Sequence, residues 1–283
     1  MTNSKSGDRK YQARQVRKYA KPVKMAGVKF KELFFHMFSF ALFLYTLRLN
    51  LGTFIPGSTD SYGGRFKYLT FLCLCIQIGY YLFSLVVDIR WMITYRLLNQ
   101  PSDLELRKTK RETYDSFVFG RFSFRRTRDY WFCTLVFPIS LIVTVFFWGL
   151  YGVSPNTVMS PLQRQYIHPH GFYNHAVHTG PLTLSVLEAL ITFHVPPSKK
   201  RKGVGVVCIF GSLYLAWVFW IASKADIWVY PFLAKMRIDG MVFFFIGVYT
   251  TAAAAYFTGI FLTSYYWRRK LIEVFKRLDC KCR

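Results

Sequence analysis

Long apolar runs separated by more polar segments dominate the pattern of this chain. Six of them are close to the 20 or so residues that an α-helix needs to cross the hydrocarbon core of a membrane. Buried strands are shorter, and a soluble core helix would show a polar face. We therefore expect an all-α, polytopic membrane protein with six transmembrane helices at about residues 30–49, 68–87, 130–151, 175–193, 204–222 and 241–267.

The first and fourth runs are the weakest of the six. Lys31, Glu32 and His36 lie in the opening turns of the first run. The fourth is short and carries Glu188. Charged side chains inside a membrane are costly, so these residues are expected to face other helices rather than lipid.

Basic residues are unevenly divided between the loops. Of the 38 Lys and Arg residues, 30 fall in the two terminal tails and in the loops after the second and fourth runs, whereas the three other loops hold five. Cytosolic loops carry such an excess, so both termini are expected in the cytosol. The chain then divides into a basic tail (residues 1–29), a membrane domain (30–267) and a second basic tail (268–283). The charge pattern is compatible with localisation of the protein in either the endoplasmic reticulum or the plasma membrane.

The composition narrows the class of protein further. The chain is 53% hydrophobic and 19% aromatic, with a net charge of +24. A soluble nucleic-acid binder shares the charge but not the apolar content, so no nucleic-acid partner is expected. The N-terminal tail has no apolar signal-peptide core, and its basic residues suit attraction to anionic lipid of the cytosolic leaflet. Binding of a partner by this tail is the alternative, and protein partners stay unknown.

Neither the cysteines nor the histidines predict a metal site. Four cysteines fall inside predicted helices, and Cys280 and Cys282 lie in the C-terminal tail, as reduced thiols or palmitoylation sites. His168 and His170 precede His175 and His178, but no Asp, Glu or Cys accompanies them in that loop. No cofactor motif is present either, so neither a metal nor a cofactor is expected.

Thr70 and His178 are two polar residues that are expected at the same depth in the membrane. Each lies within about 5 Å of the outer end of its own predicted helix, on the same side of the membrane. His36 and Asp88 lie toward the other face and cannot join them. A hydroxyl beside a neutral imidazole is the minimum for an activated nucleophile. The structural alternative is a threonine bonded to its own helix and a histidine bonded to a carbonyl.

Pro181 adds a local feature next to this pair. It removes its own amide donor and leaves the Val177 carbonyl without a helical partner, so we expect a kink beside His178 that opens a wet pocket. The alternative is an ordinary membrane-helix proline that neighbouring helices accommodate.

Motifs spread over residues 63–267 resemble a known family. They are Tyr62-Gly-Gly-Arg-Phe-Lys-Tyr-Leu-Thr70 with Asp88 downstream, Phe137-Pro with Val145-Phe-Phe-Trp148, Asn174-His175-x-x-His178-Thr179 with Glu188 downstream, and Trp228-Val-Tyr-Pro-Phe232. In their order and spacing the chain resembles the androgen-induced-gene family of six-span membrane proteins. The resemblance implies a membrane hydrolase that cleaves fatty acid esters of hydroxy fatty acids, with Thr70 as nucleophile and His178 as its essential histidine. Its partners would be this lipid ester and the membrane lipids.

Supporting residues are proposed near the same pair. Asn174 and His175 belong to the motif around His178, and Gly63 and Gly64 lie close before Thr70. The Asn174 side chain and the backbone N–H groups near the two glycines are candidate oxyanion donors. Glu188 lies about 15 Å along the helix from His178, so it is expected to pair with another helix.

The competing interpretation is a protein without enzymatic activity, a membrane scaffold or a small transporter. A transporter of polar solutes would need a polar track across the whole bilayer and often has an internal repeat. Here the polar residues concentrate toward one face, and the two halves do not repeat. A scaffold would need no paired threonine and histidine.

Overall fold

The computed structural model of the protein describes residues 22–55, 59–98, 124–168 and 171–279. Every regular element in these ranges is helical, which confirms the expected all-α class. The elements follow in the order α2 (Pro22–Gly52), η1 (Gly64–Lys67), α3 (Leu69–Leu98), α5 (Phe124–Trp131), η2 (Phe132–Val136), α6 (Phe137–Val153), η3 (Pro155–Thr157), α7 (Pro161–Tyr166), α8 (Phe172–His178), α9 (Gly180–Ile191), α10 (Lys200–Ala225), η4 (Leu233–Lys235) and α11 (Ile238–Asp279).

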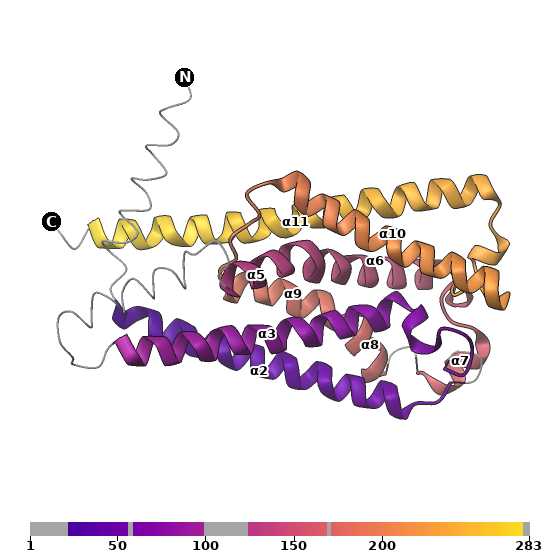
Figure 1. Ribbon diagram of the computed structural model, residues 1–283, viewed down its shortest axis with the longest axis horizontal. Coiled ribbons are helices and arrows are strands. Elements are labelled where there is room, and N and C mark those ends of the chain that lie inside the picture. Colours follow the sequence, from indigo (N-terminus) through magenta and orange to yellow (C-terminus); the bar gives the residue numbers. More distant parts are fainter. Residues whose placement is uncertain (1–21, 56–58, 99–123, 169–170, 280–283) are drawn as a thin grey trace, which may run out of the picture.

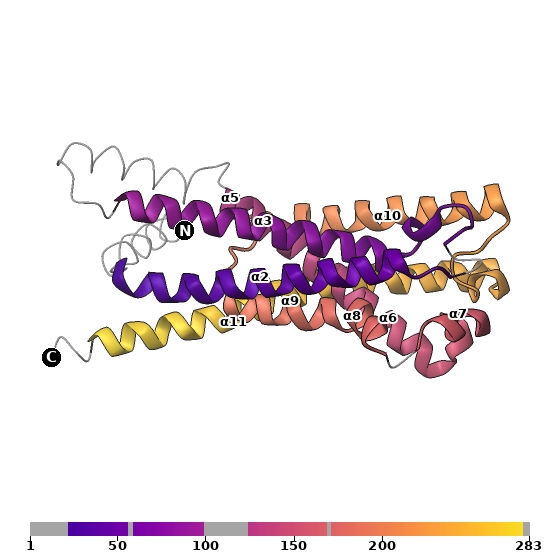
Figure 2. The same ribbon diagram turned by 90° about the horizontal axis from the view of Figure 1, so that it is seen from below.

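The long helices lie side by side along one axis and alternate in direction (Figure 1; Figure 2). Helix α2 packs on α3, α6 packs on α9 and α11, and α11 packs on α10. The start of α2 and the end of α11 lie at the same end of the bundle, at the left of Figure 1. Which side of the membrane this end faces stays a prediction.

In the described residues, five helices are long and apolar enough to span a membrane: Phe30–Gly52, Leu69–Ile93, Phe124–Val153, Lys200–Ala225 and Ile238–Trp267. The fourth expected span, 175–193, is instead divided between α8 and α9, and α9 has only 12 residues. Pro181 lies in the first turn of α9, and the helix breaks beside His178 for one residue, Thr179, whose backbone stays in the right-handed helical region. Six full-length spanning helices are therefore not present in the described residues.

Several helices run beyond the expected spans. Helix α3 continues to Leu98 and α11 to Asp279, because a helix does not have to stop where the hydrocarbon ends. The span expected at 130–151 begins earlier and contains the π-helical segment η2 just before Pro138. A proline has no N–H to donate, and a wider turn at this point restores pairing around the gap.

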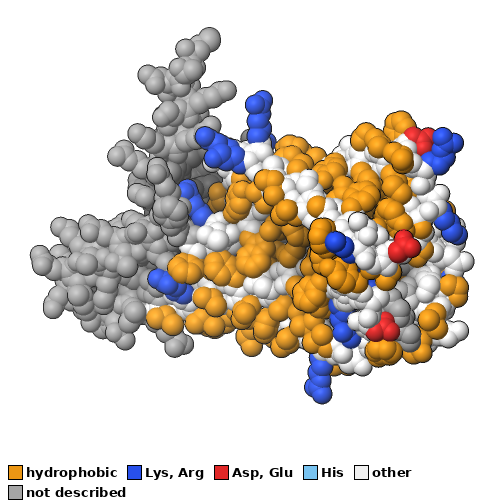
Figure 3. All heavy atoms as spheres, turned by 45° about the vertical axis from the view of Figure 1, so that its right-hand side comes forward, with side chains coloured by type: hydrophobic (Ala, Val, Ile, Leu, Met, Phe, Trp, Pro, Cys, Tyr) orange, Lys and Arg blue, Asp and Glu red, His pale blue; other side chains and the backbone are white. Residues whose placement is uncertain are grey.

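The outer surface of the bundle is apolar. Phe34 and Phe243 are 73% and 74% exposed, and hydrophobic side chains cover much of the face in Figure 3. Soluble monomers rarely expose patches of this extent, whereas lipid contact requires them. Inside, α10 and α11 approach closely at Gly203, where a Cβ atom would lie 2.1 Å from the Tyr256 hydroxyl. Small residues at such crossings let membrane helices pack tightly.

Candidate active site

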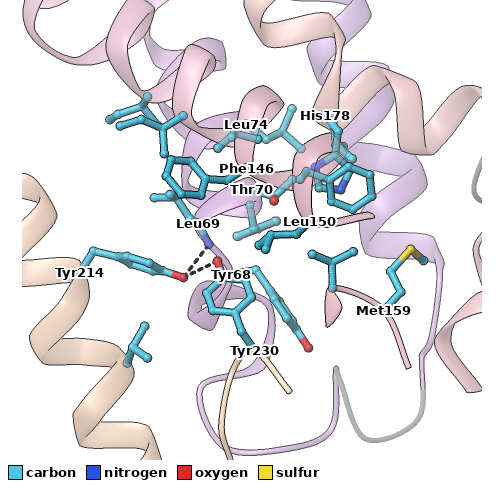
Figure 4. A pocket seen from close by; sticks show the side chains of 18 of the residues that line it. Tyr68, Leu69, Thr70, Leu74, Phe146, Leu150, Met159, His178, Tyr214 and Tyr230 are labelled. Carbon is cyan, nitrogen blue, oxygen red and sulfur yellow. Dashed lines mark hydrogen bonds between the residues drawn. The ribbon is translucent and has the colours of Figure 1, made fainter. Parts of the chain in front are cut away.

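A cavity of about 260 Å³ lies at the end of the bundle where α3 begins and α8 ends. It is enclosed mainly by α3, α6, α8, α10 and α11, and most of its lining is apolar. Thr70 and His178 both line it, and Figure 4 shows the two side chains in one cavity. The fold thus brings the predicted nucleophile and histidine to the same space.

The hydroxyl of Thr70 differs from those of most other helical threonines. Eight described threonines donate to the carbonyl four residues earlier: Thr46, Thr53, Thr59, Thr134, Thr183, Thr250, Thr251 and Thr258. Thr70 makes no hydrogen bond with any residue that the structure describes. It lies in the first turn of α3, and the carbonyl four residues earlier, on Phe66, accepts a bond from Trp217 instead. The ordinary structural use of a helical threonine is therefore absent at Thr70.

The imidazole of His178 is fixed by stacking. Its ring centroid lies 3.4 Å from that of Phe147, with the two planes 10° apart. Its Nδ1 atom is buried and has no hydrogen-bond partner among the described residues. The histidine is therefore held in orientation by an aromatic face, and its ring nitrogens are not used by a structural bond in the described residues.

The supporting residues expected from the sequence divide into two groups. Asn174 is buried and lines the cavity, as a substrate-binding residue should. His175 is exposed and lies outside the lining, where it stacks on Trp148 with a centroid distance of 5.1 Å. This position does not favour a direct role for His175.

Gly63 and Gly64 are also outside the cavity lining. Both have positive φ, +81° and +49°, and form the turn into η1. A Cβ atom at Gly63 would lie 3.0 Å from Ile221, and the N–H of Gly64 already donates to the Ser61 carbonyl. The two glycines therefore shape the turn, and the structure gives them no place as oxyanion donors.

Tyr214 of α10 fixes the start of α3. Its phenol accepts a bond from the Leu69 N–H (3.0 Å) and donates to the Lys67 carbonyl (2.9 Å). The hydroxyl of Tyr230 lies 2.9 Å from the same oxygen, and burial raises the pKa of Tyr230, so it stays protonated and can donate. Figure 4 shows Tyr214 pointing to Leu69, the residue before Thr70. No local pattern in the sequence signals this contact across 145 residues.

The cavity has two chemically different parts beside Thr70. One is apolar and lies between α6, α10 and α11, with Ile142, Phe146, Val207, Phe210, Phe244 and Ala252 in its wall. The other contains polar groups from the end of α2, η1 and α8, with Asn50, Thr53, Arg65 and Tyr173.

The histidines of the loop before α8 do not form a metal site in the part of the chain described. No group of three His, Cys, Asp or Glu side chains is placed there to hold a metal ion. His170, like Cys280 and Cys282, lies outside the described residues.

A second polar cluster is buried further along the bundle, away from the cavity. His36 of α2 lies 2.6 Å from Asp88 of α3 and 3.0 Å from Glu188 of α9. Tyr80 donates to Glu188 at 2.6 Å. The expectation that Glu188 pairs with another helix is confirmed, and so is the separation of His36 and Asp88 from Thr70, since Asp88 lies 18 residues, or about 27 Å, further along α3.

Three residues that the sequence did not single out complete this cluster. His194 lies 3.1 Å from both Asp129 and Glu188, and Arg128 lies 3.0 Å from Asp129. All three are fully or almost fully buried. They were missed because His194 and Asp129 lie just outside the apolar runs, where a charged residue looks like part of a loop. Because these ion pairs join α5, α9 and α2, the cluster holds the helices in place.

Comparison with known proteins assigns the chain to a family. The family model described as FAR-17a/AIG1-like protein matches residues 31–264, which is most of the chain. The chain belongs to the FAR-17a/AIG1-like family. The match covers the cavity, the polar cluster and all but the outermost residues of the first and last spanning helices.

Named relatives in this FAR-17a/AIG1-like family cover similar lengths. Human androgen-induced gene 1 protein is 28% identical over 210 residues, covering 74% of this chain and 81% of the relative. The androgen-dependent TFPI-regulating protein of Mesocricetus auratus is 29% identical over 222 residues, covering 76% and 82%. Its human counterpart is 27% identical over 205 residues, covering 72% and 78%. No solved structure matches the chain.

Proposed function

We propose that this protein is an integral-membrane hydrolase that cleaves the ester bond of fatty acid esters of hydroxy fatty acids, with Thr70 as its nucleophile. The observation that supports this most is the Thr70 hydroxyl, which has no hydrogen bond among the described residues and shares a cavity with His178. A threonine kept out of helix bonding beside an imidazole is the arrangement that nucleophilic catalysis needs. We place the enzyme in the endoplasmic reticulum or plasma membrane, with both termini in the cytosol.

Acylation begins the proposed reaction. The Oγ atom of Thr70 attacks the ester carbonyl carbon while His178 accepts the hydroxyl proton. The bond from this carbon to the alcohol oxygen then breaks, and the imidazolium returns the proton to that oxygen. The hydroxy fatty acid leaves, and the fatty acyl group remains bound to Thr70.

Deacylation repeats the same steps with water. His178 removes a proton from a water molecule, which attacks the acyl-threonine carbonyl. The C–O bond to Thr70 breaks, the proton returns to Thr70, and the free fatty acid leaves. The histidine serves both halves of the reaction and ends in its starting state.

Charge that develops on the carbonyl oxygen needs donors close to Thr70. Asn174 is buried in the cavity wall and offers an amide group. In the first turn of α3, the Leu69 N–H donates to Tyr214, and the N–H groups of Phe71 and Leu72 donate to the Tyr68 carbonyl. The N–H of Thr70 makes no such bond in the described ranges, so it is the backbone donor that this turn can supply. We propose these two sources as the oxyanion donors in place of Gly63 and Gly64.

Covalent labelling of the purified protein tests this proposal. An active-site-directed fluorophosphonate should label the wild type but not Thr70→Ala, and a fatty acid ester of a hydroxy fatty acid should block labelling. A scaffold or a transporter has no reason to react with this probe. Equal labelling of wild type and Thr70→Ala, or faster turnover of triacylglycerols than of the branched esters, would contradict the proposed function.

A further inference from the structure

The charged side chains that line the cavity indicate which kind of lipid would fit it. Among the described residues that line it, Arg65 is the only Lys or Arg, and none is Asp or Glu. The rest of the wall is mostly apolar. A pocket with one fixed positive charge in an apolar wall fits an amphiphile with one negative charge.

Only part of the guanidinium of Arg65 is used by the fold. Its Nε donates to the Asn50 carbonyl (3.2 Å), and its Nη2 donates to the carbonyls of Leu51 (3.2 Å) and Thr53 (2.9 Å). These three bonds hold the side chain against the C-terminal end of α2. A guanidinium has five N–H donors, so the two on Nη1 are left over. They make no hydrogen bond with any residue in the described ranges.

A second donor lies beside this group. Tyr173 of α8 lines the same part of the cavity and accepts a hydrogen bond from the Asn50 amide, which leaves its own O–H for a ligand. Burial raises the pKa of Tyr173, whereas Asn50 and the charge of Arg65 act in the opposite direction. The phenol is therefore a neutral donor close enough to Arg65 to feel its charge.

We propose that Arg65, assisted by Tyr173, binds the free carboxylate of the lipid substrate while Thr70 attacks its ester bond. This inference rests on the proposed hydrolase function and adds that the substrate must carry a free carboxylate. Arg65 and Thr70 are five residues apart, so their Cα atoms are at most about 18 Å from each other. A substrate that suits the spacing between Arg65 and Thr70 has its ester group part-way along an acyl chain that ends in the carboxylate.

The phosphate of a membrane phospholipid is the competing anion, since arginine binds both groups. The cavity favours the carboxylate. Common phospholipid head groups add an ammonium to the phosphate, and the described lining offers no acidic side chain to receive it. A fatty carboxylate needs only the one positive charge that is present.

Paired substrates test the proposal on the purified full-length protein in detergent micelles. One is a fatty acid ester of a hydroxy fatty acid, and the other is its methyl ester, in which the carboxylate is blocked. Wild type should favour the free acid in kcat/KM by about 10- to 100-fold, the value of a charged hydrogen bond. Arg65→Gln should remove this preference by raising KM for the free acid only, and Arg65→Lys should retain part of it.

The ratio of the two rates within one variant does not depend on how much of the protein is folded, so loss of stability cannot imitate the result. Arg164→Gln is the matched control, because Arg164 bonds to Asn156 in the same end of the molecule but does not line the cavity. Equal rates of wild type on both substrates, or wild-type preference in Arg65→Gln, would overturn the proposal.

A lipid-binding assay distinguishes an error in the carboxylate site from an error in the proposed hydrolase function. If neither ester is cleaved, hydrolysis is wrong, but palmitate should still raise the melting temperature of the wild type and not of Arg65→Gln, and methyl palmitate should raise neither. Stabilisation by methyl palmitate equal to that by palmitate would overturn the carboxylate site. Stabilisation by phosphatidic acid that depends on Arg65, without an effect of palmitate, would assign the site to phosphate instead.

Discussion

His178 lies flat on Phe147, with ring centroids 3.4 Å apart and planes that differ by 10°. Histidines that act as bases are commonly oriented by a carboxylate, and here an aromatic face takes that position in the described residues. No Asp or Glu is among the described residues that line the cavity around this imidazole. Catalysis should therefore depend on the shape of residue 147 as well as on His178.

Replacing Phe147 tests this dependence. Phe147→Leu keeps most of the apolar volume but loses the flat face, so kcat should fall by at least about tenfold with little change in KM. Phe147→Tyr keeps the ring and should retain most activity. Phe257→Leu, at an exposed position on α11 away from the cavity, is the control. Full activity of Phe147→Leu would show that stacking does not position the base.

Variants of Thr70 separate chemistry from stability. Thr70→Ala removes a hydroxyl that has no hydrogen bond among the described residues, so it should cost only about 1 kcal/mol in unfolding free energy. Its hydrolytic rate should fall by several orders of magnitude, as should that of His178→Ala, and the double variant should lose little more, since each change disables the same step.

Thr70→Ser keeps the nucleophilic oxygen and should preserve substantial turnover and probe labelling. Thr144→Ala is the matched control, because Thr144 is a threonine of α6 that does not line the cavity. Turnover by Thr70→Ala near the wild-type rate would exclude Thr70 as nucleophile and favour the scaffold interpretation.

Tyr214→Phe should weaken both the fold and the reaction. It removes the bonds to the Leu69 N–H and the Lys67 carbonyl, which costs about 1–3 kcal/mol when such groups stay buried. It also frees the first turn of α3, so kcat should fall by more than the loss of folded protein explains. Activity per folded molecule is the measurement, with the folded fraction taken from thermal unfolding in detergent.

Tyr230→Phe removes one hydroxyl and leaves both backbone bonds of Tyr214 in place, so its effect should be smaller. Equal effects of the two variants would argue against the role of Tyr214 at the start of α3.

The buried ionic cluster should govern stability without taking part in hydrolysis. His36→Leu removes the imidazole between the carboxylates of Asp88 and Glu188, and breaking a buried pair in this way typically costs about 3–5 kcal/mol. The melting temperature in detergent should fall clearly, while the folded fraction keeps its kcat/KM. A selective loss of kcat/KM with unchanged melting temperature would place the cluster in the mechanism.

Cysteine labelling tests the side of the membrane that the termini face. A membrane-impermeant thiol reagent should label Cys280 and Cys282 only after the plasma membrane is permeabilised, because the basic tails are expected in the cytosol. A variant without these two cysteines is the control for background. Labelling of either residue in intact cells would reverse the topology.

The sequence by itself determined the features that depend on neighbours along the chain. Runs of apolar residues predict helices wherever they occur, since each backbone group inside a membrane must be paired within its own helix. The break beside His178 was also expected, because Pro181 lacks a backbone N–H wherever it is placed. Thr70 and His178 could be matched in depth because helical rise is constant.

Tertiary structure alone decided how the helix surfaces face one another. Tyr214 reaches Leu69 across 145 residues, and His194 joins Asp129 and Glu188, although nothing in the local sequence marks either contact. From the sequence, Arg65 is one of several loop cations, whereas the fold places it in the cavity wall. Gly64 was a candidate oxyanion donor from the sequence, but in the fold its N–H donates to the Ser61 carbonyl. The constant helical rise fixes a residue's depth along its helix but not the rotation of that helix against its neighbours. In a membrane this rotation is set by packing and polar contacts between helices.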